Sequence, residues 1–325
     1  MIEQGYQMDF SKETFGVILY GPPGIGKTTT ALSDGKFGAD TLLINLERGA
    51  SRVRGVHYAL ASVLTASTYE EVLQDLETPQ AEKATTIVID TCETLVNYLK
   101  DWALRTKPDA KTKSGTFNGL KGFGHVKSEL ESFINRIKNT MHKNVVYIFH
   151  CDEKADKDGN PVQRLRCEGS FRNTVWTGID FGAYIQMING KRVACFTPDQ
   201  EYFAKGCHGI EGQIPIPQLK EGDVNDFLAR LFEKARTNMQ AESDSLKAML
   251  SAYESTMSEV RRIVDGVVDA ESANAALAVL PGLDHALTSR REASAMLAAK
   301  AKQIGIVYNP AGKEYISPKP EGDAE

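Results

Sequence analysis

The sequence predicts an α/β fold with a central, mostly parallel sheet flanked by helices, followed by a small helical C-terminal domain. From Phe15 to about Pro198, short apolar runs alternate with amphipathic stretches, as is typical of parallel strands joined by crossover helices. A glycine-rich segment, Gly21 to Thr28, follows the first apolar run and precedes a helical stretch. From about Gln240 the composition shifts toward Ala, Ser, Glu and Arg with helical periodicity.

Six apolar runs are predicted to be the strands of the sheet. They are Gly16 to Tyr20, Thr41 to Leu46, Thr85 to Asp90, Val145 to His150, Gly182 to Ile188 and Arg192 to Phe196. The runs that end at Asp90 and at His150 are almost continuously apolar, as expected of strands covered on both faces. These two strands therefore belong in the centre of the sheet.

Two irregular stretches interrupt this alternation. The first, between Thr91 and Met141, reads as a helical segment, a long glycine-containing loop and a periodic helix from about His125. The second, from Asp152 to Gly169, contains Asp158-Gly159-Asn160-Pro161, which is predicted to be the turn of a hairpin. The loop of the first stretch is longer than a simple connection between elements, which favours a functional role.

The predicted domain boundary lies at residues 239 and 240. A helix with Val224, Phe227, Leu228 and Leu231 on one apolar face is predicted to close the first domain, residues 1–239. Residues 240–325 then form either a small helical domain or a helical extension lying on the first domain, and they end in a polar tail.

The composition narrows the possible functions. A net charge of -5 and a pI near 5.8 argue against a protein that coats nucleic acid with its whole surface, so any DNA contact must be focal. No apolar run is long enough to cross a membrane, and we expect a soluble protein of the cytoplasm. The five widely spaced cysteines are expected to be reduced thiols, and no metal other than magnesium is expected.

The segment from Gly21 to Thr28 matches the pattern G-x-x-x-x-G-K-[ST] of a phosphate-binding loop. Glycines let the backbone curl so that its N–H groups point at phosphate oxygens. Lys27 would place its charge on the β- and γ-phosphates of ATP, and the Thr28 hydroxyl would ligate Mg²⁺. The predicted nucleotide-binding residues are Gly21, Pro22, Pro23, Gly24, Ile25, Gly26, Lys27, Thr28 and Thr29.

Carboxylates at two strand ends complete the predicted site. Asp90 ends a buried strand, which is the position that holds the magnesium of such nucleotide sites. Hydrolysis also needs a group that polarises the attacking water, but Asp90 is followed by Thr91 rather than by an acid. Glu47, after the strand that follows the phosphate loop, is the favoured base, and Glu93 is its rival.

The order of these features resembles the RecA-type ATPase core over roughly residues 10–235. More narrowly, it resembles the bacteriophage "AAA domain" nucleotide-binding proteins, some of which are RecA-like single-strand annealing proteins of the Sak group. The resemblance implies that Glu47 polarises water, that Asp90 serves magnesium, and that His150 takes the place of the polar sensor of the γ-phosphate. His150 stands where RecA itself would have a glutamine, and a purely structural histidine is the alternative.

The two irregular stretches match, by position, the loops with which RecA-like proteins grip single-stranded DNA. Their basic residues lie near aromatic ones, a mixture suited to phosphates and stacked bases. The DNA-binding candidates are Lys111, Lys113, Lys121, Lys154, Arg164 and Arg166. Solvated surface lysines are the alternative. Lys205 is a candidate to reach a nucleotide bound by a neighbouring subunit of a homo-oligomer, with an ordinary surface lysine as its alternative.

The resulting functional hypothesis is an ATPase of phage DNA recombination that binds single-stranded DNA and promotes annealing or strand pairing, with a single-strand-binding protein as a partner. The alternative from another class is an AAA+ remodelling ATPase or helicase loader that acts on protein partners. A third interpretation is a nucleotide-binding switch with little turnover. All three require Mg-ATP at the same loop, and none requires a membrane.

Overall fold

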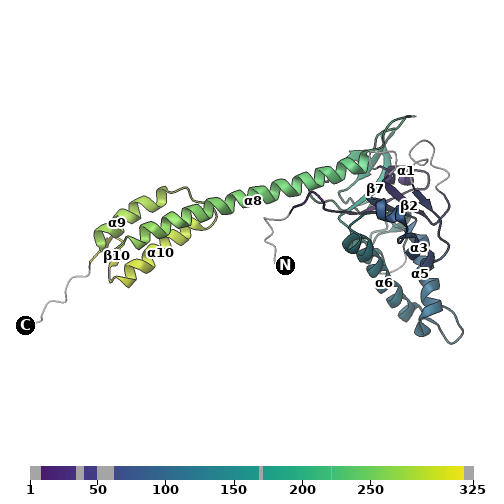
Figure 1. Cartoon of the computed structure of the whole chain (residues 1–325), viewed down its shortest axis with the longest axis horizontal. Helices are drawn as coiled ribbons and strands as arrows, with labels where there is room; N and C mark the ends of the chain where they lie inside the picture. Colours follow the sequence, from purple (N-terminus) through teal and green to yellow (C-terminus); the bar gives the residue numbers. More distant parts are fainter. Residues whose placement is uncertain (1–8, 34–39, 50–61, 168–170, 221, 318–325) are drawn as a thin grey trace, which may run out of the picture. The chain divides into compact units, whose positions relative to one another are not determined.

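The structure is a computed structural model that describes residues 9–33, 40–49, 62–167, 171–220 and 222–317. Its contacts divide the chain into two compact units. One unit is Phe10–Asn238, and the other is Met239–Glu325 together with Met1–Asp9. Each unit is described separately below (Figure 1).

The first unit contains a nine-stranded sheet whose strand order is β3-β2-β4-β5-β1-β7-β8-β9, with β6 paired to β5 alone. The strands are β1 (Gly16–Gly21), β2 (Thr41–Asn45), β3 (Ser62–Leu64), β4 (Thr86–Asp90), β5 (Asn144–Ala155), β6 (Pro161–Leu165), β7 (Phe181–Ile188), β8 (Lys191–Cys195) and β9 (Gln213–Pro215). The six strands from β3 to β7 in this order are parallel, whereas β6, β8 and β9 pair antiparallel. The predicted α/β fold class is therefore confirmed.

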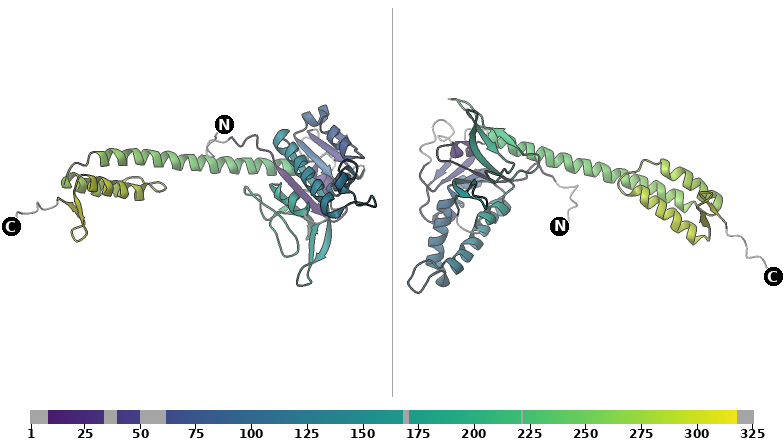
Figure 2. Two further views of the ribbon diagram at one scale, coloured as in Figure 1. Left: turned by 90° about the horizontal axis from the view of Figure 1, so that it is seen from below. Right: turned by 180° about the vertical axis from the view of Figure 1, so that it is seen from behind.

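Helices cover both faces of the sheet, so its central strands are buried throughout (Figure 2). The helices are α1 (Lys27–Ala31), α3 (Tyr69–Asp75), α4 (Pro79–Lys83), α5 (Cys92–Thr106), α6 (Gly119–Asn135) and α7 (Phe171–Thr177), with short η3 (Pro108–Ala110) and a π-helical turn η4 (Arg136–Thr140). On one face, alternate strand residues such as Ile18, Ile89 and Tyr147 pack with Tyr69 and Phe133 of α3 and α6. This alternation is the period-2 burial that fixes the register of a strand.

The central position predicted for the strands of Asp90 and His150 is confirmed, since β4 and β5 are neighbours in the middle of the sheet. All six predicted strands are present, and the bounds differ by one residue except at the end of β5, which continues to Ala155. It continues because its last residues pair with β6 around the predicted turn. There the Asp156 carboxylate accepts hydrogen bonds from the N–H groups of Asp158 and Asn160, each at 2.8 Å.

The predicted loop and the helix after it are present, but the predicted helix start at His125 is wrong, because α6 already begins at Gly119. The Asn118 side chain caps the helix by accepting from Leu120 N at 3.1 Å and Lys121 N at 3.3 Å. Gly122 is buried against the ring of Phe117, where a Cβ would lie 2.6 Å from a ring carbon. Gly122, one of the glycines that suggested a loop, therefore serves close packing near the start of a helix.

The helix predicted to close the first domain is α8 (Phe227–Asp265), which continues past the predicted boundary into the second unit. Phe227, Leu228 and Leu231 are buried as predicted, but Val224 precedes the helix and is 43% exposed. Beyond α8, the second unit contains α9 (Ala270–Val279), η5 (Leu280–Gly282) and α10 (Ser289–Gln303). Its last element is a hairpin, β10 (Val307–Asn309) and β11 (Glu314–Ile316), that the sequence patterns did not indicate.

The second unit has its own apolar core, formed by residues of α8, α9, α10 and the hairpin. Its buried members include Val260, Ala273, Leu297 and Tyr315. Asn274 ties the hairpin to α9, since its side chain donates to Tyr315 O at 2.9 Å and accepts from Tyr315 N at 2.7 Å. Among the described residues of the whole chain, no helix is both long enough and apolar enough to cross a membrane.

Candidate active site

Four parallel strands deliver the predicted site residues to one edge of the sheet. Gly21 at the end of β1 is paired with His150 on β5, and Asn45 at the end of β2 is paired with Asp90 at the end of β4. Because parallel strands all present their carboxyl ends at the same edge, side chains far apart in the sequence meet there. The structure thus brings together Lys27, Thr28, Asp90, Glu47 and His150.

The phosphate-loop segment leads from β1 directly into α1. Gly24 and Gly26 have φ angles of 75° and 94°, which residues with a side chain rarely adopt. The Lys27 ammonium donates to Gly21 O and Pro22 O, each at 3.0 Å, and so lies inside the curl of the loop. Burial lowers the pKa of Lys27, and the nearby Asp90 partly opposes this effect. The remaining predicted residues, Pro23, Ile25, Thr28 and Thr29, continue the same turn and the first turn of the helix.

The Thr28 hydroxyl and the Asp90 carboxylate contact each other. Thr28 Oγ1 donates to Asp90 Oδ2 at 2.7 Å. Asp90 is buried, which raises its pKa, while the bond from Thr28 opposes the increase. A buried carboxylate oxygen beside a threonine hydroxyl is a donor set that suits Mg²⁺, which prefers oxygen ligands. Thr28 and Asp90 therefore fit the predicted magnesium site.

Glu47 lies beside Asp90 and is held by several hydrogen bonds. Its backbone N–H donates to Asp90 O at 3.3 Å. Its side-chain Oε1 accepts from the Thr91 hydroxyl at 2.6 Å, and its Oε2 lies 3.3 Å from His150 Nε2. Partial burial would raise the pKa of Glu47, but the bonds from Thr91 and His150 outweigh it and the pKa is lowered. Glu47 is thus an ionised, oriented carboxylate.

The rival carboxylate, Glu93, is used differently. One of its oxygens accepts from the backbone N–H of His150 at 2.7 Å. Its other oxygen is buried and has no hydrogen-bond partner. Burial raises the pKa of Glu93, and the nearby Thr91 hydroxyl and His150 oppose the increase. Glu93 therefore positions the backbone of β5 at His150.

His150 connects the lysine of the loop to Glu47. Its Nδ1 lies 3.4 Å from Lys27 Nζ and its Nε2 lies 3.3 Å from Glu47 Oε2. A neutral ring that carries its proton on Nε2 satisfies both contacts, because it accepts from the ammonium and donates to the carboxylate. A group that draws Lys27 away from Gly21 O and Pro22 O would therefore also change the contact between Lys27 and His150.

Glu47, Glu93 and His150 also form a group that the sequence patterns did not indicate. One ligand atom from each lies within 4.8 Å of the other two, close enough to hold a metal ion. No metal other than magnesium was expected from the sequence. Glu47 follows β2, Glu93 is in the first turn of α5 and His150 is on β5, so no spacing in the sequence could reveal the group.

Arg192 is a further residue at this site that sequence reasoning missed. A Cβ built on Gly26 would lie 2.8 Å from the guanidinium carbon of Arg192, so the cation lies directly against the phosphate loop. Its Nε is buried without a hydrogen-bond partner. Arg192 is on β8, which pairs antiparallel at the far side of β7 and carries no motif. Only the folded sheet brings it to Gly26.

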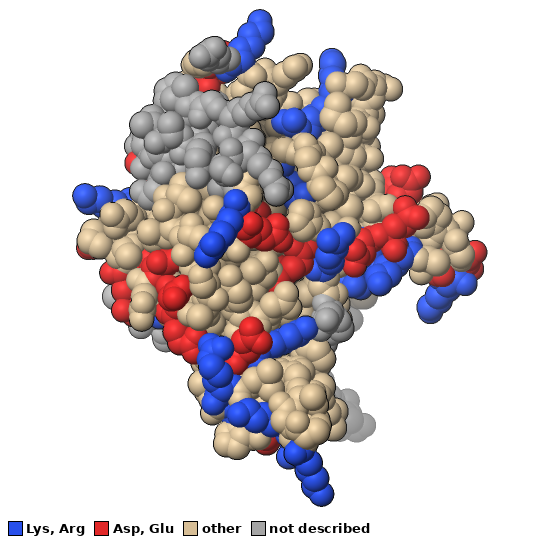
Figure 3. All heavy atoms as spheres, turned by 90° about the vertical axis from the view of Figure 1, so that its right-hand side faces the viewer, with Lys and Arg blue, Asp and Glu red and all other residues tan. Residues whose placement is uncertain are grey.

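The DNA-binding candidates lie on two segments away from the phosphate loop. Lys111, Lys113 and Lys121 are exposed on the connection from α5 to α6 and on the first turn of α6. Lys154, Arg164 and Arg166 are on the β5–β6 hairpin, where Arg166 pairs with Asp152 at 2.8 Å. Figure 3 shows Lys and Arg mixed with Asp and Glu on the face it presents. The basic residues are thus local features within a mixed surface.

A cavity of about 470 Å³ separates α5 from the base of the hairpin. Its charged lining residues are Glu93, Lys100, Asp152, Lys154, Arg166 and Arg172. Four of these are cations and two are carboxylates. Since Glu93 also holds the backbone of His150, the cavity adjoins the candidate active site.

Lys205 has intramolecular partners. Its Nζ donates to Ile179 O and lies 3.5 Å from Trp176 O. A contact with the nucleotide of another subunit would require these bonds to break, and the role stays a prediction.

The comparisons with known proteins concern this same region. A family model described as "AAA domain" matches residues 14–208, which include the phosphate loop, Glu47, Asp90 and His150. The chain belongs to this AAA domain family. As an AAA domain protein with an intact phosphate loop, it is a P-loop NTPase in fold and motif.

Among solved structures, the chain is similar to a KaiC-like protein from the hyperthermophilic archaeon Pyrococcus horikoshii OT3. The two share 14% identity, and the match covers 63% of this chain and 90% of the other, with a TM-score of 0.34. At that score nothing further about this AAA domain protein follows from the likeness. None of the curated proteins compared with the chain matched it.

Proposed function

We propose that this AAA domain protein binds Mg-ATP at the phosphate loop and hydrolyses it with Glu47 as the general base. The observation that carries the proposal is the arrangement of Thr28, Asp90 and Glu47 in one hydrogen-bonded group beside Lys27. Magnesium, when bound, would neutralise charge on the phosphates. Asp90 and Thr28 would hold it, and Lys27 would leave the carbonyls of its own loop for phosphate oxygens.

The geometry favours Glu47 over Glu93 as the base. The side chain of Glu47 is 37% exposed, so water reaches it, and its lowered pKa keeps it ionised. Glu93 has one oxygen on the backbone of His150 and the other buried. A general base must reach both the water and the reacting phosphate, and only Glu47 combines access with an ionised carboxylate.

Calorimetry and phosphate release test this function. The purified chain should bind Mg-ATP with a stoichiometry near one and release phosphate, whereas Lys27→Ala should lose binding at least about tenfold. Lys12→Ala, an exposed lysine before β1, is the matched control and should behave as the wild type. Failure of the wild type to take up Mg-ATP would refute the proposal.

We further propose that ATP turnover serves single-stranded DNA binding and annealing in phage recombination, by a homo-oligomer in the host cytoplasm with a single-strand-binding protein as partner. The support is the exposed lysines of the α5–α6 connection and the four cations of the cavity beside Glu93. Such clusters suit phosphates, and two aromatic residues are close to these lysines in the chain, Phe117 in the connection and Phe123 near the start of α6. The link from Glu93 to His150 gives an occupant of the cavity a path to the ATP site.

Fluorescence anisotropy with a labelled oligo-dT tests the DNA proposal. Binding by the wild type should strengthen with ATP and weaken with salt, and replacing Lys111, Lys113 and Lys121 by alanine should reduce it by about tenfold or more. A control with alanine at Lys12, Lys83 and Lys234 removes equal charge elsewhere in the same unit. The remodelling or loader function replaces this one if the wild type does not bind oligo-dT and if a protein partner, but not DNA, stimulates its ATP turnover.

A further inference from the structure

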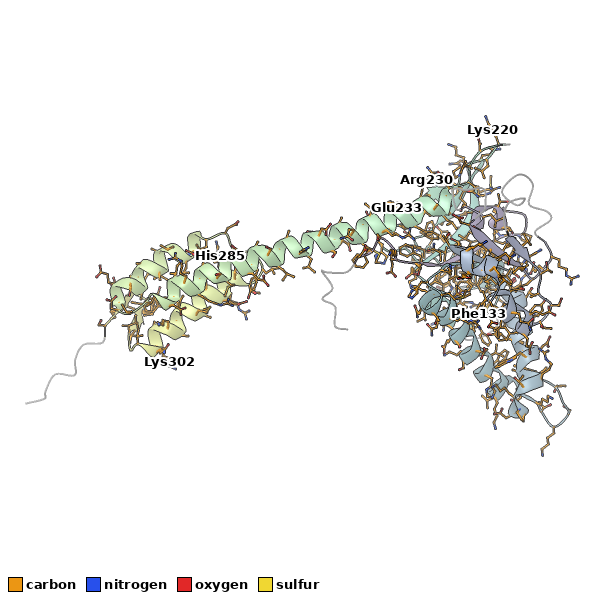
Figure 4. All side chains as sticks on the ribbon, viewed as in Figure 1. Phe133, Lys220, Arg230, Glu233, His285 and Lys302 are labelled. Atoms are coloured by element: carbon orange, nitrogen blue, oxygen red, sulfur yellow. The ribbon has the colours of Figure 1, made fainter. Side chains whose placement is uncertain are left out.

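The second unit contains an apolar pocket of about 380 Å³ that the ATPase function does not use. It lies among α9, η5, α10 and the hairpin, in the part of the chain where Figure 4 labels His285 and Lys302. Leu277, Leu280 and Leu297 form its base. Pockets of a few hundred Å³ with mostly apolar walls and few polar groups are typical binding sites for apolar groups.

An aromatic pair forms one wall of the pocket. Tyr308 and Tyr315, directly opposite each other on the hairpin, have ring centroids 5.2 Å apart at an interplanar angle of 65°. Tyr315 is buried in the core of the unit, while Tyr308 is 42% exposed and can contact an incoming group. The wall is firmly placed, since Asn274 binds both backbone groups of Tyr315.

Among the described residues, Arg290 is the only Lys, Arg, Asp or Glu that lines the pocket, and His285 is the only other ionisable side chain there besides the two tyrosines. His285 has both nitrogens engaged, with Ser289 Oγ at 3.0 Å and Leu280 O at 2.8 Å, which suits a neutral ring. Arg290 is exposed at the rim, and one of its nitrogens donates to Pro281 O at 3.3 Å. No carboxylate lines the pocket among the described residues, so its charge is complementary to an anion.

The surface of the second unit indicates that the occupant belongs to a protein. The described residues include twelve large apolar side chains that are exposed, and eight of them lie in Met239–Glu325, the smaller unit. They are Leu246, Met249, Val268, Val279, Leu287, Val307, Tyr308 and Ile316. Each of these side chains gains free energy when a partner buries it, so this unit is suited to contact with another protein.

We propose that this pocket binds a peptide segment of a partner protein by taking up one large apolar side chain next to a carboxylate. The side chain would lie between Leu297 and Tyr308, and the carboxylate would pair with Arg290, whose planar guanidinium matches carboxylate geometry. The proposal does not depend on the ATPase function, because every residue of the pocket lies in the second unit.

Anisotropy measurements on the full chain test this proposal with a fluorescein-labelled Gly-Ser-Gly-Ser-Phe peptide. The peptide with a free terminal carboxylate should bind saturably at concentrations up to about 1 mM, and the same peptide amidated at its C-terminus should bind about tenfold more weakly. Arg290→Gln should cause the same loss, whereas Arg291→Gln, an exposed neighbour outside the pocket, should cause none.

A second pair of variants tests the pocket itself. Ala298 is exposed and lines the pocket, so Ala298→Trp should fill it and abolish binding without removing a core side chain. Ala295→Trp adds the same bulk on the same helix outside the pocket and should bind as the wild type. The proposal is overturned if the wild type shows no saturable binding or if the acid and the amide bind equally. It is also overturned if Arg291→Gln or Ala295→Trp loses as much affinity as Arg290→Gln or Ala298→Trp.

Discussion

Replacing Glu47 by glutamine should remove hydrolysis and leave ATP binding intact. The glutamine side chain keeps an oxygen that accepts the 2.6 Å bond from Thr91, so it stays in place while the proton acceptor is lost. A positioned general base contributes roughly 10²- to 10⁴-fold, which corresponds to about 3 to 5.5 kcal/mol of the barrier. The expected loss therefore appears in kcat, while the Kd for Mg-ATP changes by less than about threefold.

Single-turnover phosphate release and calorimetry on the same preparations measure the two quantities. Glu93→Gln is the matched control, because its amide still has an oxygen to accept from His150 N and the substitution removes the same charge from the same edge. It should retain turnover within about tenfold of the wild type. If the Glu47 variant releases phosphate at the wild-type rate, or if the Glu93 variant loses as much of that rate as the Glu47 variant, the base has been misassigned.

Three further predictions concern the loop and its neighbours. Gly26→Ala should weaken Mg-ATP binding at least about tenfold in calorimetry, since the φ of Gly26 is 94° and the new Cβ meets Arg192. Gly24→Ala should weaken binding less, because a Cβ at Gly24 has nothing within 4 Å. Equal losses in the two variants would refute the packing argument. Arg192→Ala should weaken Mg-ATP binding about tenfold because it removes a cation lying against the loop, while the exposed neighbour Lys191 should tolerate alanine. Burial raises the pKa of Asp90 in the folded chain above its value of 3.8 in an unfolded chain. Keeping the ionised carboxylate buried therefore lowers the free energy of unfolding. This loss is absent below pH 3.8 and grows as the pH rises through the folded pKa. In EDTA at pH 7.5, Asp90→Asn should therefore melt a few degrees above the wild type, with the gap closing toward pH 4; a less stable variant at pH 7.5 contradicts this assignment.

The strands and the phosphate loop were predictable because their signals are local. Continuous apolar runs mark the central strands, and the spacing from Gly21 to Thr28 is itself the requirement for a phosphate-binding turn. The errors have a local cause as well. Gly119 and Gly122 suggested a loop, yet a cap from Asn118 and the close ring of Phe117 make them the beginning of a helix.

The contacts within the site were less predictable because they join strand ends. That Glu47 and Asp90 meet follows from parallel strands, but the division of labour between Glu47 and Glu93 depends on which oxygen meets the backbone of His150. Arg192 lies against Gly26 through antiparallel pairing at the far side of the sheet, and no spacing encodes it. The pocket of the second unit depends on a hairpin that pattern reading did not find.

The end of the phosphate-loop helix depends on residues nearly two hundred positions later. Asn225 donates to Thr29 O at 2.6 Å and to Leu32 O at 3.1 Å, and Leu228 N donates to Ser33 Oγ at 3.0 Å. The stretch that defines family membership ends at residue 208, before these contacts. A fragment cut there would remove these donors from the helix carbonyls and would uncover Phe15, on which Phe232 stacks. The smallest autonomous nucleotide-binding piece should therefore extend into the first turns of α8.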